Sequence, residues 1–355
     1  RSGRVRGPPD RLDSLSPDGR VTIEAKLFEM RGAFNQPKLP VTAAWDLTGY
    51  VAGMDLFAGV QVNDAHGKFQ SRGTWDGQRS RSSGTVNLDS AFVLDQQLSR
   101  IQGPFVVNDR EIMIGAVQTN KNDPPPPHMT AELLRGKLSV DARAMIGSES
   151  RNVYGQLEGE PTEYKAILRL SNARLEDYLR SKGGGAVRMQ GIVNGQLTLE
   201  GKGQNPKDLQ GEGTVIIKPA ALYELPVVLQ IFQRLNIAAP PDNAAFDEAL
   251  LKFDIRNEQM VFSQIDLLGN TLSLRGRGTV RFDEKLDLVF FSIVPKSQPV
   301  IPLVREIVRS ASYGMVAVDV KGSISQPRTQ VKTNLVIDNA MRNFLYSFQP
   351  FRRVI

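Results

Sequence analysis

The sequence predicts a mainly β protein: a long, twisted and curled antiparallel sheet with an open groove, and a few short amphipathic helices. Three observations support this fold class. Apolar and polar residues alternate in run after run, as in Val21 to Leu27, which is typical of a half-buried strand. Turn residues separate these runs, and the 31 glycines and 21 prolines of the sequence suit a turn-rich chain. No run approaches the roughly 18 apolar residues of a membrane span.

Along the chain, the first 20 residues are polar and predict a linker. Alternation then predicts an N-terminal β segment over residues 21–120, with strands such as 41–47 and 56–62, a turn around His66 and a hairpin turn at Asp76-Gly77. Four consecutive prolines cannot lie inside a strand or a helix, so residues 121–130 are predicted to be a Pro-rich linker.

The remaining residues, 131–355, form a predicted C-terminal β-groove segment. It repeats a strand, a glycine break and a polar turn, as at Gly201-Lys202-Gly203 and Gly276-Arg277-Gly278. These glycines lack the spacing of a phosphate-binding loop and the helix that must follow it, so we interpret them as strand breaks or bulges. Strands of about six residues at intervals of about 8–12 predict an antiparallel meander of about 15–18 strands.

Short helices interrupt the strands. Ala173 to Leu179 predicts one or two helical turns, and three amphipathic stretches predict longer helices: Leu225 to Ile237, Val300 to Ala311 and Asn339 to Phe348. Pro226 suits a helix start. Each helix is expected to cover or cap a sheet, and interfacial contact with a membrane is the alternative.

The composition excludes several kinds of site. With Cys 0, neither a disulfide nor a thiolate zinc site can form. The charge of +6 is scattered, which favours a mildly basic soluble surface over an anionic partner, and no cluster of basic and aromatic residues predicts nucleic-acid binding. The chain opens at Arg1 without an initiator Met, so we expect a fragment or a processed chain.

The sequence offers little for catalysis. The histidines, His66 and His128, lie in distant segments, and no Gly-x-Ser-x-Gly pentapeptide occurs. Asp266, Asp287 and Asp319 alternate with apolar neighbours, as solvent-facing strand residues do. We therefore predict no enzyme activity, no catalytic residue, no metal and no cofactor; an enzyme acting on glycans through Asp266 and Asp287 is kept as a hypothesis.

Four stretches carry a family resemblance: Gln196 to Leu222, Leu225 to Ile237, Phe246 to Asp287 and Val318 to Thr329. They resemble the AsmA-like C-terminal region of AsmA/TamB-type bacterial envelope proteins. The resemblance implies a periplasmic protein of a diderm bacterium, anchored in the inner membrane by a helix absent from this chain. It also implies a curled sheet with an apolar groove that takes part in phospholipid traffic and outer-membrane assembly. No catalytic motif is known to us in that family.

Taken with the family resemblance, which implies the location and the lipid role, the sequence predicts a non-catalytic periplasmic β-groove segment that supports phospholipid transport and outer-membrane maintenance. Its partners would be a phospholipid or other acyl-chain ligand, the inner membrane and envelope proteins. The alternative is a structural or adhesion β-scaffold that binds protein partners through its sheet edges. A closed, dry core formed by the same apolar residues is the less favoured alternative. The predicted groove lining is Val215, Ile217, Phe253, Ile255, Phe262, Leu272, Leu274, Val280, Phe282, Leu288 and Phe290.

Overall fold

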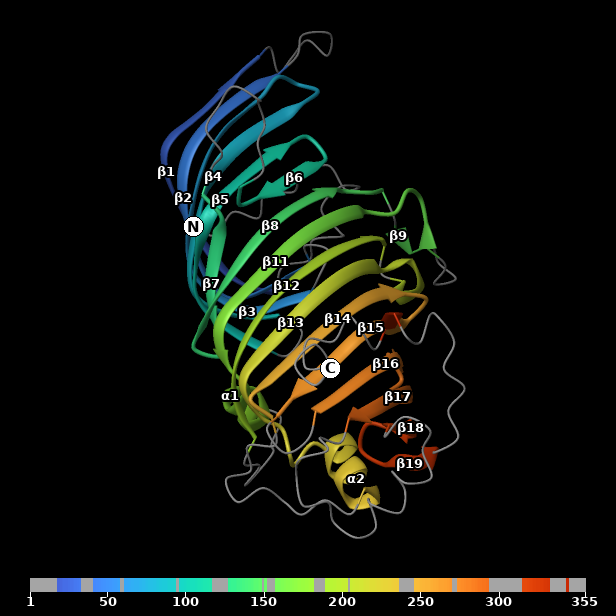
Figure 1. Ribbon diagram of the computed structural model, residues 1–355. Coiled ribbons are helices and arrows are strands. Elements are labelled where there is room, and N and C mark those ends of the chain that lie inside the picture. The colour runs from blue at the N-terminus through green and yellow to red at the C-terminus, as the bar shows by residue number, and fades with distance from the viewer. Residues whose placement is uncertain are drawn as a thin grey trace. The chain divides into compact units, whose positions relative to one another are not determined.

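The computed structural model describes residues 18–32, 41–57, 61–93, 96–116, 127–148, 150–151, 157–181, 189–203, 205–235, 246–269, 273–293, 315–332 and 343–344. In these residues 17 strands belong to one antiparallel sheet, which confirms the predicted mainly β fold (Figure 1). β9 (Ser150–Arg151) and β10 (Leu157–Glu158) form a separate two-stranded sheet.

The chain divides into two compact units. Unit 1 comprises Arg1–Leu170 and Thr198–Asp208, and unit 2 comprises Ser171–Leu197 and Leu209–Ile355. Two strands, β11 (Glu163–Arg174) and β12 (Gln190–Lys202), therefore contribute residues to both units. The domain limits expected around residues 121–130 stay a prediction.

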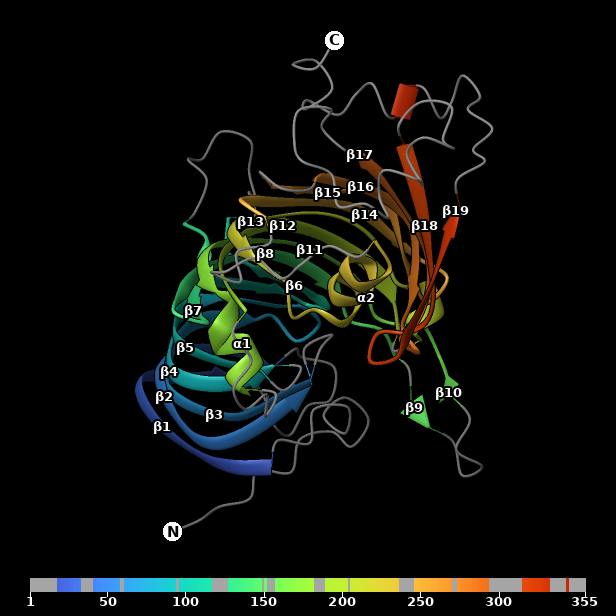
Figure 2. The ribbon, with the colours of Figure 1, turned by 60° about the horizontal axis from the view of Figure 1, so that its bottom comes forward.

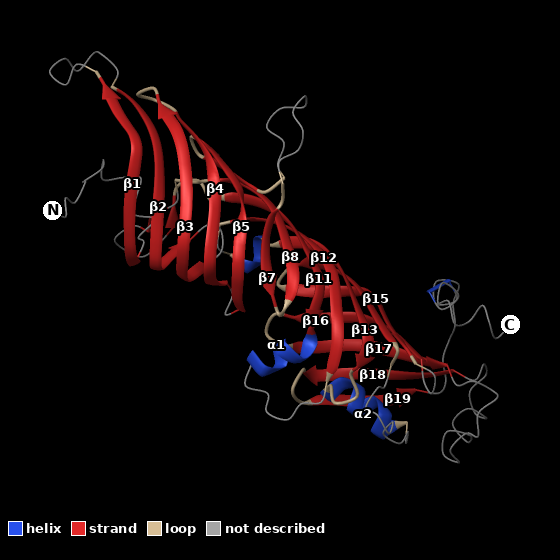
Figure 3. Ribbon diagram, turned by 90° about the vertical axis from the view of Figure 1, so that its left-hand side faces the viewer, coloured by secondary structure: helices blue, strands red, loops and turns tan. Residues whose placement is uncertain are grey.

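Unit 1 is a run of antiparallel strands. β1 to β5 pair with one another in chain order, with β1 outermost in the unit (Figure 3). β5 then pairs with both β6 and β7, and both of these pair with β8. The strands are β1 (Asp18–Arg31), β2 (Thr42–Phe57), β3 (Gln61–Trp75), β4 (Ser80–Val93), β5 (Gln96–Asn108), β6 (Glu111–Ile114), β7 (Met129–Leu133) and β8 (Gly136–Met145).

The first five strands are 13 to 16 residues long, about twice the predicted length. The expected strand over residues 56–62 was wrong, because β2 ends at Phe57 and β3 begins at Gln61. The expected turn around His66 was also wrong, because β3 continues through it. The turn at Asp76-Gly77 is confirmed: the Asp76 carboxylate accepts the backbone N–H groups of Gln78 (2.9 Å) and Arg79 (2.8 Å).

In unit 2, β13 to β19 pair in chain order, all antiparallel. A two-residue turn joins β14 to β15, with Asn257 and Glu258 both in the left-handed region. The elements are α1 (Leu175–Ser181), β13 (Gln210–Ala221), α2 (Pro226–Arg234), β14 (Glu248–Arg256), β15 (Gln259–Leu268), β16 (Ser273–Arg281), β17 (Lys285–Ile293), β18 (Met315–Ser323) and β19 (Pro327–Lys332).

Two of the predicted helices are present. α1 matches the helical turns expected from Ala173, and α2 begins at Pro226 as expected. The helix expected over residues 300–311 lies outside the described residues. Of the helix expected over residues 339–348, only Asn343 and Phe344 are described, and both are helical.

Candidate functional site

The sheet of unit 2 has one apolar face. In an antiparallel pair, directly opposed residues project to the same side, so the strand register assigns the faces. It places nine of the eleven predicted lining residues together: Val215, Ile217, Phe253, Ile255, Phe262, Leu274, Val280, Leu288 and Phe290. We call this the unit 2 apolar face. Phe282 follows β16 and is exposed, and Leu272 lies outside the described residues.

Helix α2 packs on this face (Figure 2). The Phe232 ring meets Phe246 edge-on, with ring centroids 6.0 Å apart, and Tyr223 approaches Phe232 at 5.3 Å. At the helix end, Arg234 Nε donates to Thr329 Oγ1 of β19 (3.2 Å). Most of the face is therefore buried, and Leu274 is 0% exposed and Phe290 3% exposed. The expected role of α2 as a helix that covers a sheet is confirmed.

Opening this cover without burying the exposed surface again would be costly. Val228, Ile231, Phe232 and Leu235 are all buried against the face. Exposing four such side chains would cost about 6–12 kcal/mol, comparable with the whole stability of a typical domain. Three lining residues, Val215, Ile217 and Phe253, remain half-buried, and the role of the set as a lipid lining stays a prediction.

Unit 1 has an apolar face of its own, which the sequence reasoning did not select. The alternation along each strand indicated it, but the family resemblance was strongest in the C-terminal half and drew the predicted lining there. We define the unit 1 apolar face by the positions in β2 to β5 that the register places on one side: Ala43, Trp45, Leu47, Gly49, Val51, Gly67, Phe69, Ser71, Gly73, Trp75, Ser80, Ser82, Gly84, Val86, Leu88, Ile101, Gly103, Phe105 and Val107.

The large side chains of this face remain partly open to solvent. Apart from Val51, none of its large apolar side chains is buried. Along β4, half-buried and exposed residues simply alternate, so the apolar side is only half covered. β1 extends the same side with Val21, Ile23 and Phe28, and Phe28 is 64% exposed. Both described α-helices belong to unit 2, so the described part of unit 1 has no α-helix of its own to cover this face.

Aromatic rings lie over glycines on both apolar faces. In unit 1, Phe69 lies over Gly49 and Trp45 over Gly73, and each ring and its glycine are directly paired across two strands. A Cβ at either glycine would collide with the ring. In unit 2, Phe290 covers Gly276 in the same way. Of the expected strand break or bulge at Gly276 and Gly278, the structure shows a bulge: β16 runs through both glycines, and the register shifts opposite them, between Phe262 and Ile265 of β15.

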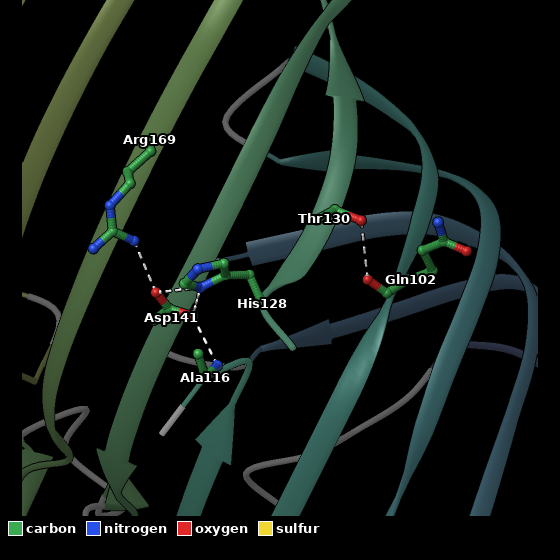
Figure 4. Close-up of polar contacts among 6 residues, drawn as sticks. All are labelled: Gln102, Ala116, His128, Thr130, Asp141 and Arg169. Atoms are coloured by element: carbon green, nitrogen blue, oxygen red, sulfur yellow. Dashed lines mark hydrogen bonds and ion pairs between the residues drawn. The ribbon is translucent and has the colours of Figure 1, made fainter. Parts of the chain in front are cut away.

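One polar cluster joins β6, β7, β8 and β11 within unit 1 (Figure 4). The Asp141 carboxylate accepts the backbone N–H of Ala116 (2.8 Å), an N–H of Arg169 (2.9 Å) and Nδ1–H of His128 (2.7 Å). Nearby, Thr130 Oγ1 donates to the Gln102 carbonyl (3.4 Å).

The environment of Asp141 favours its charged form. Burial raises the pKa of Asp141, but the hydrogen bonds from His128, Ala116 and Arg169 outweigh burial, so the net pKa is lowered. The donors come from β11 and from the residues next to β6 and β7, so the carboxylate on β8 links these segments of unit 1. The cluster therefore acts as a clasp between strands.

A second buried carboxylate lies on the other, polar face of unit 2. Asp266 pairs directly with Arg275, at 3.3 Å, and their side chains are only 7% and 4% exposed. The Phe344 ring lies 4.7 Å from the Arg275 guanidinium and contacts Phe291. Burial raises the pKa of Asp266 against the effects of Gln264 and Arg275. The expectation that Asp266 is solvent-facing was wrong.

The carboxylates considered for catalysis do not form a pair. Asp266 is paired with Arg275, whereas Asp287 is exposed on β17 and lies 3.8 Å from Lys321. His66 contacts Asp64 and His128 contacts Asp141, in different parts of unit 1. In the described ranges, no three His, Cys, Asp or Glu side chains are grouped closely enough to hold a metal ion.

No helix in the described part of the chain has the length and apolar character needed to cross a bilayer. Comparisons with protein-family models, with curated proteins and with solved structures return no match for this chain.

Proposed function

We propose that this chain is a non-catalytic lipid-binding module that holds acyl chains on the unit 1 apolar face. One observation carries the proposal: a sheet five strands wide presents an apolar side whose large side chains are only half buried, while its other side is polar. Contiguous exposed apolar surface of this kind marks a binding site. Burying methylenes against it is favourable by up to about 0.8 kcal/mol each.

The proposed setting is the periplasm of a diderm bacterium. There the module would support phospholipid transport between the membranes and maintenance of the outer membrane. The resemblance to AsmA-like proteins supports this setting. The module would act beside an inner-membrane anchor and envelope proteins, with no cofactor and no nucleic acid.

The test is to purify the full chain, extract it with organic solvent and quantify bound lipid by mass spectrometry. Val86 and Thr85 are neighbours on β4 that face opposite sides. We expect Val86→Asp to lower the recovered lipid at least tenfold and Thr85→Asp to leave it unchanged. Wild-type protein that repeatedly carries no lipid, although its far-UV circular dichroism shows a folded sheet, would contradict the proposal.

The second candidate, an envelope scaffold, is favoured by the exposure of β1. Its residues are exposed on both faces, and Ile23 is 59% exposed. An outer strand with open backbone groups and apolar side chains can pair with a strand of another protein. In contrast, β19 is only 6 residues long, begins with Pro327 and carries Arg328 and Lys332, features that protect an edge. A photo-crosslinker at Ile23 that captures one defined protein, with no lipid captured at Phe69, would favour the scaffold.

A further inference from the structure

We infer that the unit 1 apolar face recognises acyl chains and is indifferent to the lipid headgroup; this inference rests on the proposed function. The assigned positions of this face carry no charge. In β1 to β5 as described, the register places no Asp, Glu, Lys or Arg among the residues of this face or of its extension through Val21, Ile23, Ala25, Phe28 and Met30.

The few polar groups on the face offer little to a headgroup. The indole N–H of Trp45 donates to Ser71 Oγ (3.2 Å), so both groups are already engaged with each other. Ser80 and Ser82 lie within the first three residues of β4, and Trp75 adds one indole N–H. The remaining positions are apolar side chains or glycines, and three of the glycines are covered by aromatic rings. The surface therefore presents carbon almost throughout.

Several charged residues of these strands lie on the opposite side and are paired there. Arg72 and Asp46 form an ion pair at 2.7 Å, and Arg31 pairs with Glu29 at 2.8 Å. The Tyr50 hydroxyl donates to Glu24 (3.5 Å). A phosphate or ammonium group beside tails bound on the apolar side would have no charged partner among the described residues of that side. Since desolvating an unpaired charge is unfavourable, the headgroup stays in water.

Selectivity then comes from the tails. Discrimination between headgroups requires placed polar partners, such as an Arg fork for a phosphate. Here the free energy of binding depends on the buried hydrocarbon, so each added buried methylene strengthens binding by up to about fourfold, equivalent to about 0.8 kcal/mol. Lipids with the same tails and different headgroups should bind alike.

The experiment offers the purified full chain an equimolar mixture of phosphatidylglycerol, phosphatidylethanolamine and phosphatidylcholine with identical acyl chains. Bound lipid is recovered and quantified by mass spectrometry. We expect the three headgroups within about threefold of their input ratio. In a second series, phosphatidylcholines with longer chains should outcompete shorter ones.

Two matched variants separate the faces. Phe69 lies on the apolar face and Lys68 on the polar face of the same strand. We expect Phe69→Glu to abolish binding of all three lipids together, with Leu88→Gln as a milder second variant. Lys68→Glu should leave both the amount and the composition unchanged.

The experiment distinguishes failure of this inference from failure of the proposed function. A preference above tenfold for one headgroup, or a shift in composition caused by Lys68→Glu, would overturn the inference and leave acyl-chain binding intact. No bound lipid in the wild type, or only a protein partner at this face, would overturn the proposed function itself.

Discussion

Units 1 and 2 build the same kind of sheet and treat its apolar side differently. In unit 2 the sequence supplies α2, and its side chains bury the face that the strands present. In unit 1 the strands are longer and equally alternating, yet their apolar side chains stay half exposed. A sheet gains most by covering its apolar side, so the half-open side of unit 1 is the feature on which the proposed binding role depends. The predictions below test that difference.

Removing an aromatic ring should affect the two units very unequally. Phe232→Ala deletes a ring that is 2% exposed and should lower the free energy of unfolding by about 3–5 kcal/mol. Phe69→Ala deletes a half-buried ring and should cost about 1 kcal/mol. Urea unfolding followed by far-UV circular dichroism measures both. Equal losses would mean that the two faces are packed alike.

The cross-strand ion pairs provide the next contrast. Asp266→Ala removes the carboxylate that offsets the burial of the Arg275 guanidinium, and should cost about 3–5 kcal/mol. Asp46→Ala breaks the corresponding pair in unit 1, where the Arg72 side chain is 78% exposed, and should cost at most about 1 kcal/mol. Urea midpoints of the two variants give the comparison. A small loss of unfolding free energy in Asp266→Ala would show that water reaches the Asp266–Arg275 pair.

Glycines under aromatic rings should differ in the same direction. A Cβ at Gly276 would lie 2.6 Å from the buried Phe290 ring, which has no room to move, so Gly276→Ala should cost about 1–3 kcal/mol. At Gly49 the half-buried Phe69 ring can swing toward solvent, so Gly49→Ala should cost less than about 1 kcal/mol. Thermal unfolding of both variants tests the order, and a larger loss at Gly49 would reverse the account.

The smallest expected effect concerns pH. The folded-state pKa of Asp141 is lowered, so its contribution to stability is present above the unfolded value of about 3.9 and is lost as the pH falls through the folded pKa. Asp141→Asn should therefore flatten the decline of stability below about pH 4. Trp45 and Trp75, the only tryptophans, both lie in unit 1, so their fluorescence follows this unit. If stability falls with pH in the same way in the variant and the wild type, the interactions of Asp141 do not cause the decline.

Much of the fold could be predicted from local pattern. Alternation gave the mainly β class, and Pro226 with the apolar stripe that follows it gave α2. Strand length was underestimated because His66 and Gly73 suggest turns. In the structure both residues lie inside β3, and the Trp45 ring lies over Gly73. The burial of Asp266 was missed because Phe344, which lies beside its partner Arg275, comes from a distant part of the chain. The alternation of apolar and polar residues identified which residues share a face of the sheet, but it could not show what covers that face.

Lipid capture at single positions tests the central claim most directly. A photoreactive amino acid is placed at Leu88 on the unit 1 apolar face, at its neighbour Asn87 on the polar face, and at Leu288 under the cover in unit 2. After irradiation in the presence of phospholipid vesicles, intact-mass spectrometry should show lipid adducts at Leu88 and none at Asn87 or Leu288. Adducts at Leu288 without adducts at Leu88, or equal adducts at Leu88 and Asn87, would contradict the account.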